Sequence, residues 1–262
     1  MRTMRVRQPA VADLFYPADP AELRGVIEDA MAGAEAGPVP KAIVAPHAGY
    51  VYSGPVAGSA YARVAPARSA ITRVVLLGPA HRAPVVAVAA SSAEAFATPL
   101  GLVRVDEERR DALVDQGLVA VRDDAHAGEH SLEVQLPFLQ VALGDVAVLP
   151  LAVGRVDPGQ VAAVLEAACG GDETLGVVST DLSHYHDRAE ATQIDRRTAA
   201  AVVAKRPDRL GPSDACGVVA LQGLLVAAAG HRLDVELLDL RTSADTAGGP
   251  HRVVGYGAFA LA

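Results

Sequence analysis

The chain has 262 residues, of which 51% are hydrophobic, and its formal net charge is −8. A chain of this length can bury a large core, and we expect a single domain over residues 1–262 rather than two small ones. No apolar run approaches the roughly 18 residues of a membrane span, and the N-terminal segment lacks the apolar stretch of a secretory signal. The acidic charge, without blocks of lysine or arginine, argues against nucleic acid and membranes as partners. From the lack of a membrane span and of a signal-like apolar stretch, we expect a cytoplasmic protein.

Short apolar segments alternate with segments of helical periodicity along most of the chain. Strands are predicted at residues 42–46, 73–78, 85–90, 146–153, 175–181, 233–240 and 253–261. Helices are predicted at residues 18–34, 55–65, 106–117, 129–143, 158–168, 193–205 and 215–230. Apolar strands separated by helices are typical of a sheet that is buried on both faces. The predicted fold is a three-layer α/β domain with a central mixed, largely parallel sheet flanked by helices.

Local signals predict where several helices begin or bend. Pro55 is a favourable first residue for the second helix. Pro137 is expected to kink or divide the helix predicted at residues 129–143. Ser213 or Asp214 is expected to cap the last helix.

Three histidines follow predicted strands: His47, His81 and His184. In parallel α/β sheets, ligands bind just beyond the carboxyl ends of the strands. Neutral imidazole is the commonest metal ligand and also a general base near neutral pH. The alternative is that each histidine is an ordinary loop residue. The recurrence favours one shared site.

Cys216 is predicted in the first turn of the last helix, where free N–H groups and the helix dipole lower the pKa of a thiol and favour a metal-binding thiolate. The alternative is a small buried hydrophobic residue, which is our interpretation of Cys169. Because the chain has only two cysteines, no disulfide framework is expected. Cys216 is therefore a candidate ligand beside the histidines.

Asp181 and His184 lie three residues apart beyond a predicted strand. In one interpretation Asp181 completes a ligand set of two histidines and one carboxylate, which leaves open positions on iron. In the other, Asp181 orients a histidine and His184 acts as a general acid or base. An Asx turn with an exposed histidine is the third possibility.

His130 and Glu133, with Glu129 beside them, share one face of a predicted helix. This spacing occurs among metal ligands, but we interpret the residues as a buried polar pair that braces the site. Tyr16 and Tyr52 are candidates for packing or for the pocket wall. The remaining histidines are expected at the surface: His126, His186, His231 and His251.

Seven motifs of the chain occur in the order found in the Memo-like protein family, which is named from a mediator of cell motility. They are FYP, PHAGYVYSG, GPAH, EHSLEVQLPFL, STDLSHY, ACG and TSAD followed by VVGYG. The chain resembles this family from about Val6 to Ala260. The resemblance implies a single α/β domain similar to the class III extradiol dioxygenases.

The resemblance also implies site residues. The metal-binding trio of the family corresponds to His47, His81 and Cys216, while His184 corresponds to the acid/base histidine of the dioxygenases and Asp181 to a polar residue of the same cleft. Two aromatic residues correspond to the pocket lining: Tyr16 and Tyr52. Because a thiolate is softer than the carboxylate of the dioxygenases, one ion of iron or copper is expected, with zinc as an alternative.

Three functional hypotheses follow. The leading one is a Memo-like enzyme with mononuclear-metal redox or dioxygenase-like chemistry on an unknown small molecule. The second is a non-catalytic module that binds a peptide or a partner protein. The third is metal-dependent hydrolysis, in which a metal such as zinc lowers the pKa of bound water. Assembly into a homo-oligomer is compatible with each hypothesis.

Overall fold

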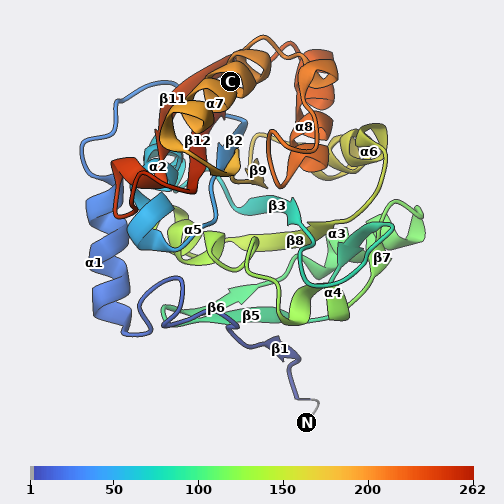
Figure 1. The fold of residues 1–262 in the computed structure, drawn as a ribbon. Coiled ribbons are helices and arrows are strands. Elements are labelled where there is room, and N and C mark those ends of the chain that lie inside the picture. The colour runs from blue at the N-terminus through green and yellow to red at the C-terminus, as the bar shows by residue number, and fades with distance from the viewer. Residues whose placement is uncertain (1–2) are drawn as a thin grey trace.

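A computed structural model describes residues 3–262, and its centre is a mixed sheet (Figure 1). In spatial order, the sheet contains β10 (His184–His186), β12 (Val253–Leu261), β2 (Ala42–Ala45), β9 (Thr174–Ser179), β3 (Arg73–Pro79), β8 (Ala147–Val153), β4 (Val88–Ala90) and β7 (Ala120–Val121). Strand β11 (Val235–Thr242) pairs with β12. The middle strands β2, β9, β3 and β8 are parallel, whereas β12 and β4 run antiparallel to β2 and β8. The mixed sheet expected from the sequence is confirmed.

Helices cover both faces of the sheet. One core cluster contains residues of α1 (Pro20–Met31), α2 (Tyr50–Val64), α4 (Asp124–Ala127) and α5 (Gln135–Leu143). The other contains residues of α3 (Glu107–Asp115), α6 (Pro158–Ala168), α7 (Arg188–Val203) and α8 (Val218–Gly230). The described part of the chain also contains three short 3-10 helices: η1 (Ala65–Ala67), η2 (Pro207–Arg209) and η3 (Ser243–Asp245). The three-layer α/β architecture is therefore as predicted.

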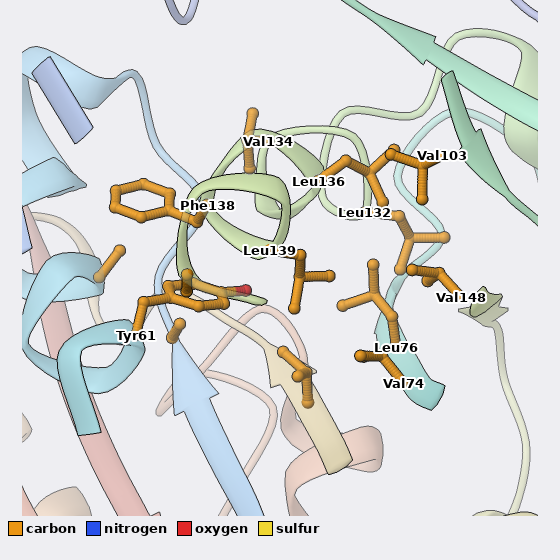
Figure 2. Packing of buried hydrophobic residues seen from close by; sticks show 14 of the residues in the cluster. Tyr61, Val74, Leu76, Val103, Leu132, Val134, Leu136, Phe138, Leu139 and Val148 are labelled. Atoms are coloured by element: carbon orange, nitrogen blue, oxygen red, sulfur yellow. The ribbon is translucent and has the colours of Figure 1, made fainter. Parts of the chain in front are cut away.

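Successive residues of the middle strands point to opposite faces of the sheet. In β3, Val74 and Leu76 belong to the first core cluster, and Val75 and Leu77 belong to the second. Figure 2 shows the first pair in the cluster that also contains Leu139 of α5. Because both faces are buried, the strand reads as a continuous apolar run instead of an alternating one.

Helix α1 begins where its local signals predict. The side chain of Asp19 accepts hydrogen bonds of 2.9 Å from the backbone N–H groups of Ala21 and Glu22. Pro20 occupies the first helical position, where its missing N–H costs nothing. Asp157 caps α6 in a similar way and forms a capping box.

Two other helices begin elsewhere than predicted. Helix α2 begins at Tyr50, because the carbonyl of Gly49 already accepts the first bonds of the helix, and it passes through Pro55. Helix α5 begins only at Gln135, so Pro137 lies in its first turn. A proline there removes no intrahelical hydrogen bond, and the expected kink or division does not occur.

The cap predicted for α8 is also wrong. This helix begins at Val218 with Gly217 as its N-cap, not with Ser213 or Asp214. The carboxylate of Asp214 instead accepts a 2.7 Å hydrogen bond from the backbone of Gly211 and closes the turn before the helix. Asp214 thus hydrogen-bonds to the backbone of its own turn and does not cap the helix.

A small second sheet was not predicted. It contains β1 (Val6–Arg7), β5 (Ala95–Thr98) and β6 (Gly101–Arg104), and it lies against the first core cluster through buried residues of the latter two strands. Its strands have two to four residues each, too few for a clear periodicity. Within residues 3–262, no helix has the length and hydropathy of a membrane span.

His126, which was predicted at the surface, is buried. Its Nε2 donates a 2.9 Å hydrogen bond to the carbonyl of Ala89 in β4, and its ring stands edge-on to Phe96. Burial lowers the pKa of the ring, so it is neutral near neutral pH. The other three histidines assigned to the surface are partly or fully exposed: His186, His231 and His251.

Candidate metal centre

Three adjacent parallel strands, β2, β9 and β3, end at the same edge of the sheet. The second residue after each strand is His47, Asp181 and His81, respectively. The register pairs Ala45 with Ser179, so the first two ends are level. Because the carboxyl ends of parallel strands meet at one edge, the fold gathers these side chains there.

Cys216 joins the two histidines. Its Sγ lies 3.3 Å from Nε2 of His47, and the ring centroids of His47 and His81 are 5.4 Å apart. One ligand atom from each of the three residues lies within 4.8 Å of the others. This spacing is compatible with a single shared ion, whose bonds to nitrogen and sulfur are about 2.0–2.3 Å long. The structure therefore brings together the trio that the sequence predicted.

A chain of buried hydrogen bonds fixes the tautomer of His47. The amide nitrogen of Gln135 donates to the carbonyl of Pro46 at 2.9 Å and to Oγ of Ser179 at 2.8 Å. Oγ of Ser179 donates its own hydrogen to the carbonyl of Ser131 at 2.6 Å, so it only accepts from Nδ1 of His47, at 2.9 Å. Nδ1 therefore carries the hydrogen, and Nε2 keeps the lone pair that a metal ligand needs.

Glu129 fixes His81 in a similar way. Its carboxylate accepts from Nδ1 of His81 at 3.0 Å and from the backbone N–H groups of His81, His130 and Ser131. Burial alone would raise the pKa of Glu129, but the hydrogen bonds from His81 and Ser131 outweigh burial and lower it to about 2. An ionised carboxylate only accepts, so Nδ1 of His81 carries a hydrogen, and in the neutral ring Nε2 is the atom that can bind a metal.

Cys216 lies just before α8, not in its first turn. The backbone N–H of Asp181 donates to Sγ at 3.3 Å, and the carbonyl of Asp181 accepts from the backbone of Cys216 at 3.1 Å. Burial, and then the charge of Asp181, raise the pKa of the thiol to about 12. The predicted lowering by the helix is therefore wrong for the protein without metal. Coordination would reverse this balance, because a metal ion deprotonates a thiol that binds it.

Asp181 and His184 make contacts other than those expected. Oδ1 of Asp181 accepts from the backbone N–H of His47 at 2.7 Å, and burial raises the pKa of this carboxyl group. His184 lies in β10, where its Nδ1 donates to the carbonyl of Leu182 at 2.8 Å. Its ring is thus held by a backbone carbonyl rather than by Asp181. Among residues 3–262, Asp181 does not belong to the set of ligand atoms around Cys216.

His130 supplies another ring at the site. It stacks on His81 with centroids 4.9 Å apart and stands edge-on to His47 at 5.5 Å. Burial, and then the charge of His47, lower the pKa of His130 to about 4. Within the described residues, a second set of potential ligand atoms shares His81 with the first and adds Glu129 and His130.

Glu133 binds the N-terminal arm, residues 7–16, and not the residues of the trio. Its carboxylate accepts from the guanidinium of Arg7, from the hydroxyl of Tyr16 at 2.6 Å, and from the backbone N–H groups of Ala10 and Val11. Tyr16 is consequently buried, and its pKa is raised first by burial and then by Glu133. Glu133 therefore stabilises the position of the arm, whereas the sequence predicted that it would brace the site.

A cavity of about 350 Å³ opens beside the trio and is lined by His81 and Cys216. Its other walls come from the loop after β3, the end of β8 and the start of α8. Neither Tyr16 nor Tyr52 lines this cavity, and Tyr52 lies in the first turn of α2 with 39% of its surface exposed.

Sequence reasoning did not assign the residues that orient the two imidazoles: Ser179, Gln135 and Glu129. Gln135 carried a usable signal, because it is a lone polar residue between apolar neighbours. A buried polar side chain must find hydrogen-bond partners, so such a residue marks an internal network. Glu129 stands next to His130 and Ser179 stands two residues before Asp181, but neither carried a comparable signal.

Comparisons with known proteins agree with the sequence motifs. The family model described as Memo-like protein matches residues 7–260. A MEMO1 family protein of Methanopyrus kandleri is 39% identical, with 97% of this chain and 98% of that protein covered. Another, from Aquifex aeolicus, is 36% identical with the same coverage of 97% and 98%. An uncharacterized protein from Escherichia coli K12 has a similar structure, with a TM-score of 0.51, 14% identity, and coverage of 82% of this chain and 98% of that chain. This last likeness concerns the fold alone.

Proposed function

This chain belongs to the Memo-like protein family, and on that basis we propose that it is a mononuclear metal enzyme whose ion is held by His47, His81 and Cys216. The observation that carries the proposal is the spacing of their ligand atoms, all within 4.8 Å of one another. The hydrogen bonds of Ser179 and Glu129 support it, since each places the hydrogen on Nδ1 and leaves Nε2 of the neutral ring as the atom that can bind a metal.

The surroundings also fit a cation. The carboxylate of Asp181 lies within electrostatic reach of the thiol of Cys216, the carboxylate of Glu129 lies beside His81, and each is buried. Buried negative charge is costly unless it is paired or coordinates a metal. Two imidazoles and a thiolate suit iron, copper or zinc. When bound, iron or copper would supply redox chemistry and any of the three would act as a Lewis acid.

His184 is our candidate for proton transfer. Its Nδ1–H is bound to the carbonyl of Leu182, which leaves the lone pair of Nε2 to accept a proton. Burial lowers the pKa of His47 to about 3, and the charges of His81 and His184 add to this effect, so His184 lies within electrostatic reach of the trio. It is partly exposed and can exchange protons with solvent.

Metal analysis of anaerobically purified variants tests both assignments. His47→Ala should lose the metal, whereas His184→Ala should keep the wild-type stoichiometry. In an oxygen-uptake screen, His184→Ala should lose about 10²- to 10⁴-fold of any turnover, the range for a general acid or base. His251→Ala is the control, since this histidine is exposed. Equal metal loss in His184→Ala and His47→Ala would refute the role of His184, and full metal content in His47→Ala would refute the metal site.

A further inference from the structure

We propose that Arg155 determines the specificity of this site by binding the carboxylate of a small, otherwise apolar substrate. The inference rests on the proposed metal-dependent function, because the cavity that Arg155 lines is also lined by His81 and Cys216. Its volume of about 350 Å³ is that of a small-molecule pocket. A substrate in it would contact the metal residues and Arg155 together.

The walls of the cavity are mostly apolar. They include Ala83, Pro84, Val85, Val153 and Val219. Apart from the metal residues, Arg155 is the ionisable side chain of this lining, and no aspartate or glutamate belongs to it. An apolar pocket with a small number of polar groups is the usual design by which a site orients a small ligand.

The charge of Arg155 is not neutralised within the protein. Elsewhere in the chain, an aspartate two residues after an arginine pairs with it: Arg122 with Asp124, and Arg206 with Asp208. Arg155 has Asp157 at the same spacing, but the carboxylate of Asp157 caps α6 and accepts from the helix backbone. Within residues 3–262, no carboxylate lies within ion-pair distance of Arg155.

The backbone that carries Arg155 is hydrogen-bonded to the segment around Val85, which also lines the cavity. The N–H of Arg155 donates to the carbonyl of Val85 at 2.8 Å, and the N–H of Gly154 donates to the carbonyl of Ala87 at 3.0 Å. The approach is so close that a Cβ at Gly154 would lie 2.2 Å from the carbonyl oxygen of Val85. A fixed backbone leaves only the side chain to be ordered when a ligand binds.

The chemistry favours a carboxylate over a phosphate. The planar guanidinium matches a carboxylate with two parallel hydrogen bonds. A phosphate group carries nearly two negative charges, whereas Arg155 offers one positive charge. The ionised Glu129 beside His81 would repel the second negative charge of a phosphate. A monoanion therefore complements this cavity better than a dianion.

Calorimetric titration of the zinc-loaded protein with phenylacetate and with its neutral isostere phenylacetamide tests the inference. Wild-type protein should bind phenylacetate more tightly, and Arg155→Gln should weaken phenylacetate binding about 10- to 100-fold without changing phenylacetamide binding. The control is Arg82→Gln, because Arg82 and Arg155 are both exposed and Arg82 follows His81 directly but does not line the cavity. It should bind both probes as the wild type does.

The inference is overturned if wild-type protein does not bind phenylacetate, if Arg155→Gln binds it unchanged, or if both arginine variants lose it equally. Zinc content is measured on each sample. Full zinc content without preference for the carboxylate would refute the role of Arg155 alone. Conversely, a wild-type protein that takes up neither zinc, iron nor copper would refute the metal function, whereas binding of phenylacetate that depends on Arg155 in the metal-free protein would still support this inference.

Discussion

The change Glu129→Gln tests whether a buried carboxylate selects the metal-binding tautomer of His81. The carboxylate accepts from the Nδ1 of His81 and from three backbone N–H groups. A glutamine has one acceptor oxygen, so in either orientation at least one of these groups faces its NH₂. Metal affinity should fall about 10- to 100-fold, the usual effect of removing a carboxylate that orients a metal-binding histidine. This corresponds to about 1.4–2.7 kcal/mol.

Glu133→Gln is the matched control. Glu133 is also fully buried and accepts four hydrogen bonds, but these come from the N-terminal arm. Both variants should lose stability by about 1–3 kcal/mol, because each leaves a buried donor without an acceptor. Only Glu129→Gln should lose metal affinity, since only Glu129 touches a ligand of the proposed ion.

Two measurements separate these effects. Competition of zinc with a chromophoric chelator gives the metal affinity, and urea unfolding of the metal-free proteins gives the stability. The reasoning fails if Glu129→Gln binds zinc as tightly as Glu133→Gln. It also fails if both variants lose zinc affinity in proportion to their loss of stability, since the carboxylate of Glu129 would then act only on the fold.

Three further outcomes are expected. Gly217→Ala should lower the free energy of unfolding by about 1–3 kcal/mol in urea, because the new Cβ would lie 2.9 Å from a threonine side chain. Gly25→Ala has open space around it and should raise the free energy of unfolding by about 0.5–1 kcal/mol. Removal of metal by a chelator should leave the far-UV circular dichroism spectrum and cooperative unfolding intact, because the core is large and the site is preformed; loss of cooperativity would contradict this. In the metal-free protein, burial lowers the pKa of His130 to about 4 from 6.5, so unfolding takes up a proton below pH 6.5. The contribution of His130 to the free energy of unfolding is fully present above pH 6.5 and falls toward pH 4 by up to about 1.4 kcal/mol per pH unit. His130→Gln should reduce this slope, whereas His251→Gln should not.

The strands and the residues beyond them were predictable because their signals are local. A buried strand of a parallel sheet is a short apolar run, and the residue that ends it stands at the binding edge of the sheet. His47 and His81 were located in this way. Cys216 required the family motif in addition, since its place depends on a turn whose aspartate, Asp214, was misread as a helix cap.

The hydrogen bonds that give the site its chemistry were not predictable, because they join distant parts of the chain. Ser179 is 132 residues from His47, and Glu129 is 48 residues from His81. The thiol of Cys216 shows the same limit. A helix terminus alone lowers the pKa of a thiol, but burial and Asp181, neither of which is visible in the local sequence, outweigh that effect.

The imidazoles of His47 and His81 differ in hydrogen-bond partner and in exposure, so the two sides of the site are not equivalent. His47 is buried and its Nδ1 is bound to the neutral hydroxyl of Ser179, whereas His81 is 31% exposed at the side chain and bound to the charged Glu129. A carboxylate partner raises the basicity of an imidazole more than a hydroxyl does. The histidine with the charged partner thus stands on the open side, where His81 and Cys216 line the cavity. A ligand would therefore reach the proposed ion past these two residues, while His47 would hold the ion from the protein interior.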